Sequence, residues 1–456
     1  MTARPRALFA TVLALAAASC GIARAQTPTL VVDAGSGRVL QAENATDPWY
    51  PASITKLMTT YVALDMVRRG QVRMDSLLTM SERAASMPPS KLGLRPGLTL
   101  TLDNALKIIM VKSANDVATM IGENLGGSVE GFAGLMNQAS RRLGMRESRW
   151  YNPSGLPDPR QQTSARDMAI LARALLGEFP EHQDLFHIGA VQLGRVVMRN
   201  HNGLIGRYPG ADGMKTGFIC AGGFNVVSTA TRGGRRLITV LMGYPSARER
   251  DLKAADLFDA NFNSSGWGAQ TLDSLPLSAQ MSPRDMRAYV CGPKRRQPAE
   301  EDDGQASAFN AENPITSLFS SATMGSSFGG VSPSGRRTLG PRVAFAPIPV
   351  WIGAQPGGND DQLMVRGRGR VRVARERRGP AVRAASKASA PTPAAVAFTS
   401  TSTPQIMAGK KIDPVKSAKG APRAVAAKAK PAVAGTNPGA KTAAKPVAKK
   451  SASAKE

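Results

Sequence analysis

Histidine, cysteine and aromatic side chains are scarce in this chain of 456 residues. It has three histidines and three cysteines, and Phe, Trp and Tyr together make up 5% of it. No His-Glu-x-x-His pair occurs. A Ser-His-Asp triad and a zinc centre are therefore not expected. We expect the histidines to fill surface or core positions; they are His182, His187 and His201.

Long apolar runs are also missing, apart from one near the start. Two arginines precede the apolar run Ala7–Ala18, which predicts a secretory signal peptide, residues 1–25, cleaved after Ala25. The run is too short to span a bilayer comfortably. A lipoprotein signal cut before Cys20 is the rival interpretation, but Ala-Ala-Ser precedes that cysteine. We expect export to the periplasm or the exterior of the cell envelope, where Cys220 and Cys291 either pair or stay free.

The excess of positive charge is concentrated in the C-terminal part. Residues 362–456 carry 21 Lys and Arg against three acidic residues, in a chain of net charge +26. Ala, Lys, Pro, Ser and Thr dominate this segment, and such a composition buries too little apolar surface to offset the entropy of ordering. We expect a disordered tail that is either a solvated linker or an attachment to an anionic envelope surface. Nucleic acid is not the expected partner, because export is expected.

Residues 26–270 have the composition of a folded domain with a sizeable core. The β-type runs "TLVVD" and "RVLQA" near its start, and "FNVVSTAT" and "RLITVLMGY" near its end, flank helical segments. We expect an α+β fold, in which both ends of the domain build one antiparallel sheet with helices packed on it. Asp103 is expected to cap one helix and Thr163 or Ser164 another. Residues 271–361 are expected to be a linker or poorly ordered, with a short strand or docking segment in "RVAFAPIPVWIG".

The stretch "PASITKLMTT" places Ser53 three positions before Lys56 at the start of an expected helix. Helical spacing puts the two side chains on one face, within reach for the lysine amine to take the serine proton. A lysine can act as a base only when burial or a second cation lowers its pKa. The free N–H groups at a helix start also favour an oxyanion. Taken alone, however, this common pattern favours an ordinary helix surface.

Two further elements change that interpretation. "KSAND" places Ser113 and Asn115 in a turn between two expected helices. "GMKTGF" places Lys215, Thr216 and Gly217 just before the C-terminal hairpin. Ser-x-x-Lys, Ser-x-Asn and Lys-Thr-Gly are the motif set of penicillin-binding proteins and class A β-lactamases. Each motif alone can occur by chance, but the three motifs together and in this order indicate a functional site.

Roughly residues 27–265 resemble the low-molecular-mass penicillin-binding proteins of the D-alanyl-D-alanine carboxypeptidase type. Beside the three motifs, the resemblance rests on "VVDAGSGRVLQAENA", "NPSGLPDPRQQTSARDMAILARALL" and "GADGMKTGFICAGGFNVVSTATRGGRRLITVLMG". It implies a fold like that of β-lactamases and penicillin-binding proteins. It also implies removal of the terminal D-Ala from peptidoglycan stem pentapeptides, acylation by β-lactam antibiotics, and no cofactor or metal.

The resemblance further implies roles for the motif residues. Ser53 attacks the carbonyl of the penultimate D-Ala, with Lys56 as its general base. Ser113 passes a proton to the leaving D-Ala and Asn115 holds a substrate amide. The backbone N–H groups of Ser53 and Phe218 form the oxyanion hole. Phe218 departs from the family, in which a polar residue is common after Lys-Thr-Gly, but the implied role uses only its backbone.

The remaining implied residues bind substrate. Lys215 keeps Lys56 from protonating, and Thr216 holds the terminal carboxylate together with an arginine. Spacing favours Arg250 as that arginine, with Arg248 as the fallback. The strand that carries Lys-Thr-Gly, with Gly217, pairs with the peptide as an added strand. Many relatives carry a β-rich C-terminal domain and a terminal amphipathic helix, and neither is evident here after about residue 270.

Three alternatives remain open at this point. A D,D-endopeptidase that cuts cross-links uses the same residues. A class A β-lactamase needs a glutamate for deacylation, and the "RWYNPSGLPDP" region contains none. A non-catalytic wall-binding protein has no reason to keep Ser53, Lys56, Asn115 and Lys215 together.

Overall fold

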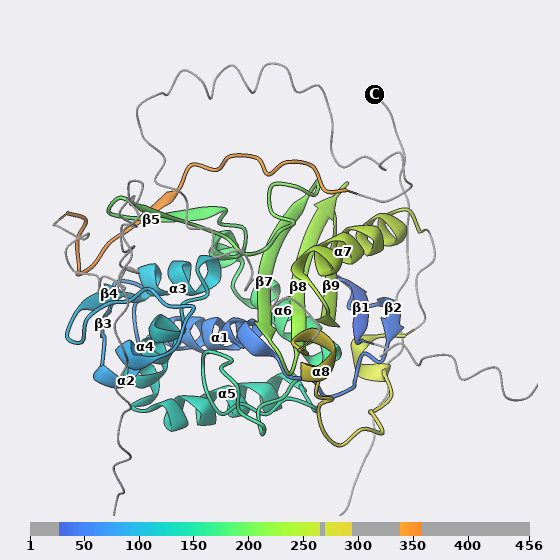
Figure 1. Cartoon of the computed structure of the whole chain (residues 1–456), viewed down its shortest axis with the longest axis horizontal. Helices are drawn as coiled ribbons and strands as arrows, with labels where there is room; N and C mark the ends of the chain where they lie inside the picture. Colours follow the sequence, from blue (N-terminus) through green and yellow to red (C-terminus); the bar gives the residue numbers. More distant parts are fainter. Residues whose placement is uncertain (1–26, 265–269, 294–337, 358–456) are drawn as a thin grey trace, which may run out of the picture. The chain divides into compact units, whose positions relative to one another are not determined.

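The computed structural model describes residues 27–264, 270–293 and 338–357 (Figure 1). The expected signal peptide at residues 1–25 and the expected tail at residues 362–456 lie outside these ranges. Among the described residues, no helix combines the length and the apolar character needed to cross a membrane.

A five-stranded antiparallel sheet contains strands from both ends of the domain, as predicted. Its order is β2-β1-β9-β8-β7, so the first two strands of the chain lie beside the last strands of the domain. This pairing confirms the expected α+β fold. The strands are β1 (Thr29–Asp33), β2 (Val39–Glu43), β7 (Ala211–Ile219), β8 (Gly223–Arg232) and β9 (Arg235–Tyr244).

Helices cover both faces of this sheet, and the alternation of side chains along each strand explains why. Val31 belongs to a core cluster with Phe258 of α7, whereas the next residue, Val32, belongs to the larger core on the opposite face. Figure 1 shows α7 across β8 and β9, and α1 to α5 gathered beside the edge strand β7. The longer helices are α1 (Thr55–Arg68), α3 (Leu102–Val111), α4 (Asn115–Gly126), α5 (Val129–Leu143), α6 (Ala165–Glu178) and α7 (Ala247–Phe262).

Shorter elements complete the described part. Two helices and three 3-10 turns are α2 (Glu82–Ser86), α8 (Arg287–Val290), η1 (Ala52–Ile54), η2 (Pro180–Phe186) and η3 (Leu272–Ser274). Two small sheets contain β3 (Leu77–Thr79) with β4 (Thr99–Thr101), and β5 (Ala190–Leu193) with β6 (Val196–Arg199) and β10 (Ile348–Val350).

The predicted helix caps are partly wrong. Ser164 caps α6, because its hydroxyl accepts a hydrogen bond from the backbone N–H of Asp167. The cap of α3 is Thr101 and not Asp103: the Thr101 hydroxyl accepts from the N–H of Asn104 at 3.2 Å. Asp103 lies inside the first turn and pairs with Lys107 at 2.6 Å.

The described parts of residues 271–361 pack against the domain, where the sequence indicates a linker. Cys291 forms a disulfide with Cys220 at the end of β7. β10 adds to β5 in parallel, with Val350 opposite Leu193. The strand falls within the "RVAFAPIPVWIG" stretch. Both contacts join segments that are distant in sequence, which is why composition alone does not reveal them.

Candidate active site

Ser53 lies in a strained turn beside the edge of the large sheet. It is the middle residue of η1, and α1 follows directly. Its neighbour Ala52 has a φ of 49°, in the left-handed region that few residues other than glycine adopt. Gly155 approaches so closely that a Cβ there would lie 1.9 Å from the carbonyl oxygen of Ala52. The surrounding structure thus holds this turn in an unfavourable conformation and fixes the position of Ser53.

Lys56, one turn further along, is completely buried and contacts three oxygen atoms. Its Nζ lies 3.0 Å from Ser53 Oγ, 2.9 Å from Asn115 Oδ1 and 2.6 Å from the carbonyl oxygen of Ser154. The Asn115 amide is oriented by a bond from its Nδ2 to the carbonyl oxygen of Pro88 at 3.1 Å. The oxygens of Asn115 and Ser154 can only accept, so they take two N–H groups of the amine. A neutral Lys56 then directs its lone pair at Ser53, whose O–H donates.

The neutral form of Lys56 is favoured by its surroundings. Burial is the main cause and lowers the pKa of Lys56 well below its ordinary value, and the positive charge of Lys215 lowers it further. The carboxylate of Asp116 opposes both effects and raises the pKa. Lys215 is itself buried in β7, and its Nζ donates to the carbonyl oxygen of Thr216 at 3.0 Å. The lysine of the first motif is therefore suited to accept a proton.

The turn between α3 and α4 lies close to Lys56, because Asn115 accepts a hydrogen bond from its amine. Ser113 has a φ of 61°, and its buried hydroxyl has no hydrogen-bond partner among the described residues. Asn115 begins α4, and its N–H donates to the carbonyl oxygen of Ser90 at 2.7 Å. Asp116 accepts from the N–H groups of Leu92 and Gly93 at 3.0 and 2.8 Å. The Ser-x-Asn motif thus holds the loop that forms one wall of the cavity and leaves the Ser113 hydroxyl available to a ligand.

Gly217 brings the edge of β7 against the backbone of the Ser53 turn. A Cβ at Gly217 would lie 2.7 Å from the Ser53 nitrogen and 2.9 Å from the Ile54 nitrogen, closer than real Cβ contacts. Only glycine allows this approach. The next residue, Phe218, stacks its ring on Phe224 with centroids 4.2 Å apart. The Phe218 side chain is therefore held by packing against the neighbouring strand β8.

A cavity of about 360 Å³ opens between these elements. Five of the predicted residues line it: Ser53, Ser113, Asn115, Gly217 and Phe218. Lys56 and Lys215 lie buried behind the lining. The part of the chain that the structure describes contains no cluster of His, Cys, Asp and Glu that could hold a metal ion.

The loop that supplies the Ser154 carbonyl is held by its own polar contacts. Asn152 Oδ1 accepts from the N–H groups of Ser154 and Gly155 at 3.2 and 2.8 Å. Gln161 Oε1 accepts from the N–H of Asn152, and its Nε2 donates to Thr55 Oγ1 at 3.1 Å. The loop is thereby tied to the first residue of α1.

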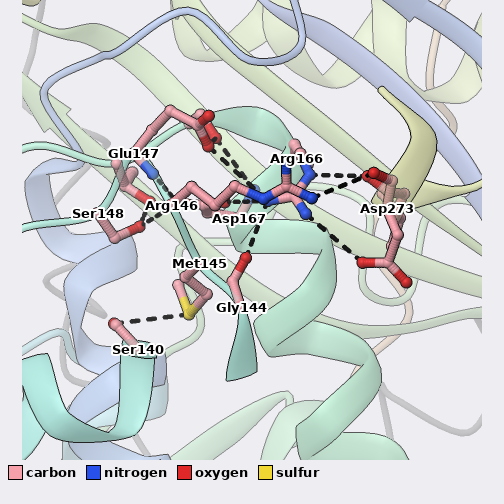
Figure 2. A network of polar contacts seen from close by, with 12 residues as sticks. Ser140, Gly144, Met145, Arg146, Glu147, Ser148, Arg166, Asp167 and Asp273 are labelled. Atoms are coloured by element: carbon pink, nitrogen blue, oxygen red, sulfur yellow. Dashed lines mark hydrogen bonds and ion pairs between the residues drawn. The ribbon is translucent and has the colours of Figure 1, made fainter. Parts of the chain in front are cut away.

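A charged network lies at the base of the same loop (Figure 2). Arg166 is 1% exposed, and its guanidinium donates to the Asp167 carboxylate at 2.9 Å and to the carbonyl oxygen of Leu272 at 2.7 Å. Asp167 also accepts from the N–H of Glu147 and from Ser148 Oγ, both at 2.8 Å. Burial, with the nearby Glu147 carboxylate, raises the pKa of Asp167 to about 7.

The sequence profile of the peptidase S11 family, described as D-alanyl-D-alanine carboxypeptidase, matches residues 17–246. The chain belongs to this family. The D-alanyl-D-alanine carboxypeptidase DacA of Haemophilus influenzae is 32% identical over 243 residues, which are 52% of this chain and 62% of that protein. DacB2 of Mycobacterium tuberculosis, with the same description, is 30% identical over 244 residues, 51% of this chain and 81% of that protein.

A comparison with solved structures finds the same family of folds. Penicillin binding protein 5 of Haemophilus influenzae superposes with a TM-score of 0.50 at 30% identity, over 52% of this chain and 70% of that one. The fold expected from the resemblance is thus confirmed. The chain spans about three fifths of the length of the first curated relatives it matches.

Two of the predicted carboxypeptidase residues lie apart from this cavity lining. Thr216 pairs with Val226, which packs under α7, so the Thr216 side chain points to the α7 face of the sheet. Arg250 is completely buried on that face, where it donates to Asp251 at 2.9 Å and to the carbonyl oxygen of Asn225 at 3.3 Å. The fallback residue, Arg248, lines a different hollow beside Arg207.

Other residues of the site were not predicted from the sequence. His201, which was expected to be a filler, and Arg287 line the cavity. Ser154 contributes only a backbone oxygen, which has no sequence signal. The sequence contains one signal for Arg287, which is Cys291, four residues after it. A disulfide between Cys291 and Cys220 places Arg287 close to the Lys-Thr-Gly motif.

Proposed function

We propose that this chain is a serine-type D-alanyl-D-alanine carboxypeptidase that removes the terminal D-Ala from peptidoglycan stem pentapeptides. The observation that carries the proposal is the bonding of Lys56: two carbonyl acceptors and a lowered pKa leave its lone pair for Ser53. Such an amine can act as a general base at neutral pH. Family membership supplies the reaction class.

In the acylation step, Lys56 takes the proton of the Ser53 hydroxyl while Oγ bonds to the carbonyl carbon of the penultimate D-Ala. The N–H groups of Ser53 and Phe218 stabilise the resulting oxyanion. The carbon–nitrogen bond then breaks, and the proton reaches the leaving D-Ala amine through Ser113, whose buried hydroxyl has no partner among the described residues. Asn115 holds the substrate amide. In the second step water attacks the acyl-enzyme carbonyl, and Lys56 accepts its proton. Lys56 returns this proton to Ser53 Oγ as the bond to the acyl group breaks, and the shortened peptide leaves with Ser53 restored.

We assign the terminal carboxylate to Lys215 and to the backbone edge of β7 at Thr216, the two residues that precede Gly217 on the edge strand. Lys215 also keeps Lys56 neutral by charge repulsion. Arg250 contributes through the backbone of Asn225, which pairs with Gly217. The peptide adds to β7 as a sixth strand, because β7 is the edge of the five-stranded sheet.

Two measurements test this function. A fluorescent penicillin should label the wild-type protein covalently and should not label Ser53→Ala. Release of free D-Ala from a pentapeptide should be compared with cleavage of a cross-linked dimer. An unlabelled wild type contradicts the enzyme assignment, and cleavage of the dimer alone favours the D,D-endopeptidase.

We also propose that the protein works in the periplasm or on the exterior of the envelope, where stem peptides and β-lactams reach it. The basic segment 362–456 would bind anionic groups of that envelope by charge. Deletion from residue 362 should leave D-Ala release intact and lower retention on isolated cell walls at low salt. Unchanged retention would favour a passive linker.

A further inference from the structure

Residues 270–291, here called the strap, reach the rim of the catalytic cavity. Arg287, the first residue of α8, lines that cavity beside Ile219, Cys220 and Ala221. Ile219 is the last residue of β7, beyond Lys-Thr-Gly, and Cys220 and Ala221 follow it in the turn. The strap thus adds a side chain to a cavity whose other walls come from the motifs.

The end of the strap that carries Arg287 is fixed to the turn that follows β7. The Cys220–Cys291 disulfide joins the two covalently. Between them, the N–H of Met286 donates to the carbonyl oxygen of Ala221 at 2.9 Å. Met286 and Val290 are buried, at 2% and 0% exposure, so the short helix between them has little freedom. Arg287 is consequently held at a defined place on the rim.

The start of the strap is fixed as well. Arg166 donates to the carbonyl oxygen of Leu272 at 2.7 Å, and Figure 2 shows Arg166 beside the next residue, Asp273. Further along, Ser278 Oγ donates to Asp47 Oδ1 at 2.5 Å and Gln280 Nε2 to its Oδ2 at 2.6 Å. The strap is therefore an ordered segment that contacts the domain at both ends and in its middle.

The cavity lining is electrostatically one-sided. Among the described lining residues there is no Asp or Glu, and Arg287 is the one permanent cation. Its side chain is 63% exposed and pairs with Asp285 through Nη1 at 2.5 Å. A guanidinium carries five N–H donors, so this single contact leaves donors for a second carboxylate.

The direction of the bound peptide decides which part of it meets Arg287. In the proposed complex the terminal carboxylate lies near Thr216 and the scissile carbonyl at the N–H of Phe218. The peptide therefore runs antiparallel to β7, and its residues upstream of the scissile bond extend toward Ile219 and Ala221. Arg287 lies there, on the acyl-donor side and away from the leaving group.

We propose that Arg287 is a specificity residue that binds a carboxylate on the acyl-donor part of the stem peptide, upstream of the two terminal D-Ala residues. The inference rests on the proposed carboxypeptidase function. It makes an acidic stem peptide the preferred substrate class. It also gives the disulfide a role in holding Arg287 at this subsite.

The test uses the full-length protein and two peptides that end in D-Ala-D-Ala. The third residue from the C-terminus carries a side-chain carboxylate in one peptide and the matching carboxamide in the other. Wild type should favour the carboxylate peptide in kcat/KM by about fivefold at low salt, and the preference should shrink at high salt. Arg287→Gln should remove the preference by slowing the carboxylate peptide alone.

Two neighbouring variants sharpen the test. Arg284→Gln changes the same charge on an exposed strap residue that does not line the cavity, and should keep the wild-type preference. Asp285→Asn removes the partner that competes for Arg287 and should increase the preference. Asparagine can still accept from the N–H of Arg287, so α8 should remain in place.

The outcomes separate the two proposals. Equal use of both peptides by wild type, or a preference that survives in Arg287→Gln, overturns the specificity role while D-Ala release still supports the carboxypeptidase. No D-Ala from either peptide with wild type overturns the function and the inference together. Penicillin labelling of Arg287→Gln at the wild-type rate shows that the reacting groups are intact.

Discussion

The amine of Lys56 lies 3.0 Å from the hydroxyl oxygen of Ser53, and both belong to one continuous backbone turn. Because two carbonyl oxygens take the other bonds of this amine, its protonation state controls whether Ser53 has a base. The charges of two buried neighbours act on that state in opposite directions.

The first prediction concerns the pH dependence of acylation. Lys215 lowers the pKa of Lys56, so Lys215→Ala should move the acid limb of the β-lactam acylation profile to higher pH. Asp116 raises that pKa, so Asp116→Asn should move the limb to lower pH. Acylation rates measured between pH 5 and 10, with circular dichroism to check folding, test both. Shifts of the same sign in the two variants contradict the assigned base.

The second prediction concerns Gly217. Gly217→Ala places a Cβ against the backbone nitrogens of Ser53 and Ile54, and neither can move without displacing η1. The oxyanion donors are displaced with it, so penicillin acylation should fall by about 100-fold or more. Gly134→Ala is the control, because nothing lies within 4 Å of a Cβ there. Wild-type acylation of Gly217→Ala would show that the close approach is not required.

The third prediction concerns stability against pH. The folded chain holds a proton on Asp167 up to about pH 7, whereas the unfolded chain releases it near the ordinary carboxyl pKa of about 4. This contribution to stability is complete below about pH 4 and is lost as the pH rises through 7, by at most about 1.4 kcal/mol per unit. Melting temperatures between pH 5 and 8 should fall in wild type and change less in Asp167→Asn. An equal slope in both proteins would exclude Asp167 as the titrating group.

The fourth prediction concerns the disulfide. The bond closes a loop between positions 71 residues apart, so its loss in Cys291→Ser should cost about 2–4 kcal/mol of unfolding free energy. A reductant should lower the melting temperature of wild type and leave that of Cys291→Ser unchanged. The variant should also lose the preference for the carboxylate peptide. A retained preference would show that Met286 and Val290 hold the strap without the disulfide.

The strand alternation and the three motifs were sufficient to predict the sheet and the region of the site. Local signals were weaker at boundaries. Asp103 and Thr101 are both residue types that favour an N-cap. Thr101 caps α3 because it is the last residue of β4 and enters the helix in an extended conformation. The sequence also located Arg250 by spacing, but spacing does not say which face of the sheet a side chain occupies.

The sequence by itself determined which residues can react, because Ser-x-x-Lys needs only one helical turn to bring nucleophile and base together. Tertiary structure decided whether they do. It buried Lys56, placed Lys215 and the Ser154 carbonyl around it, and brought Gly217 against the Ser53 turn. It also brought Arg287 to the rim through the disulfide. Burial, the approach of two charges and a disulfide all depend on contacts between residues that are far apart in the chain. A local sequence pattern does not contain these contacts.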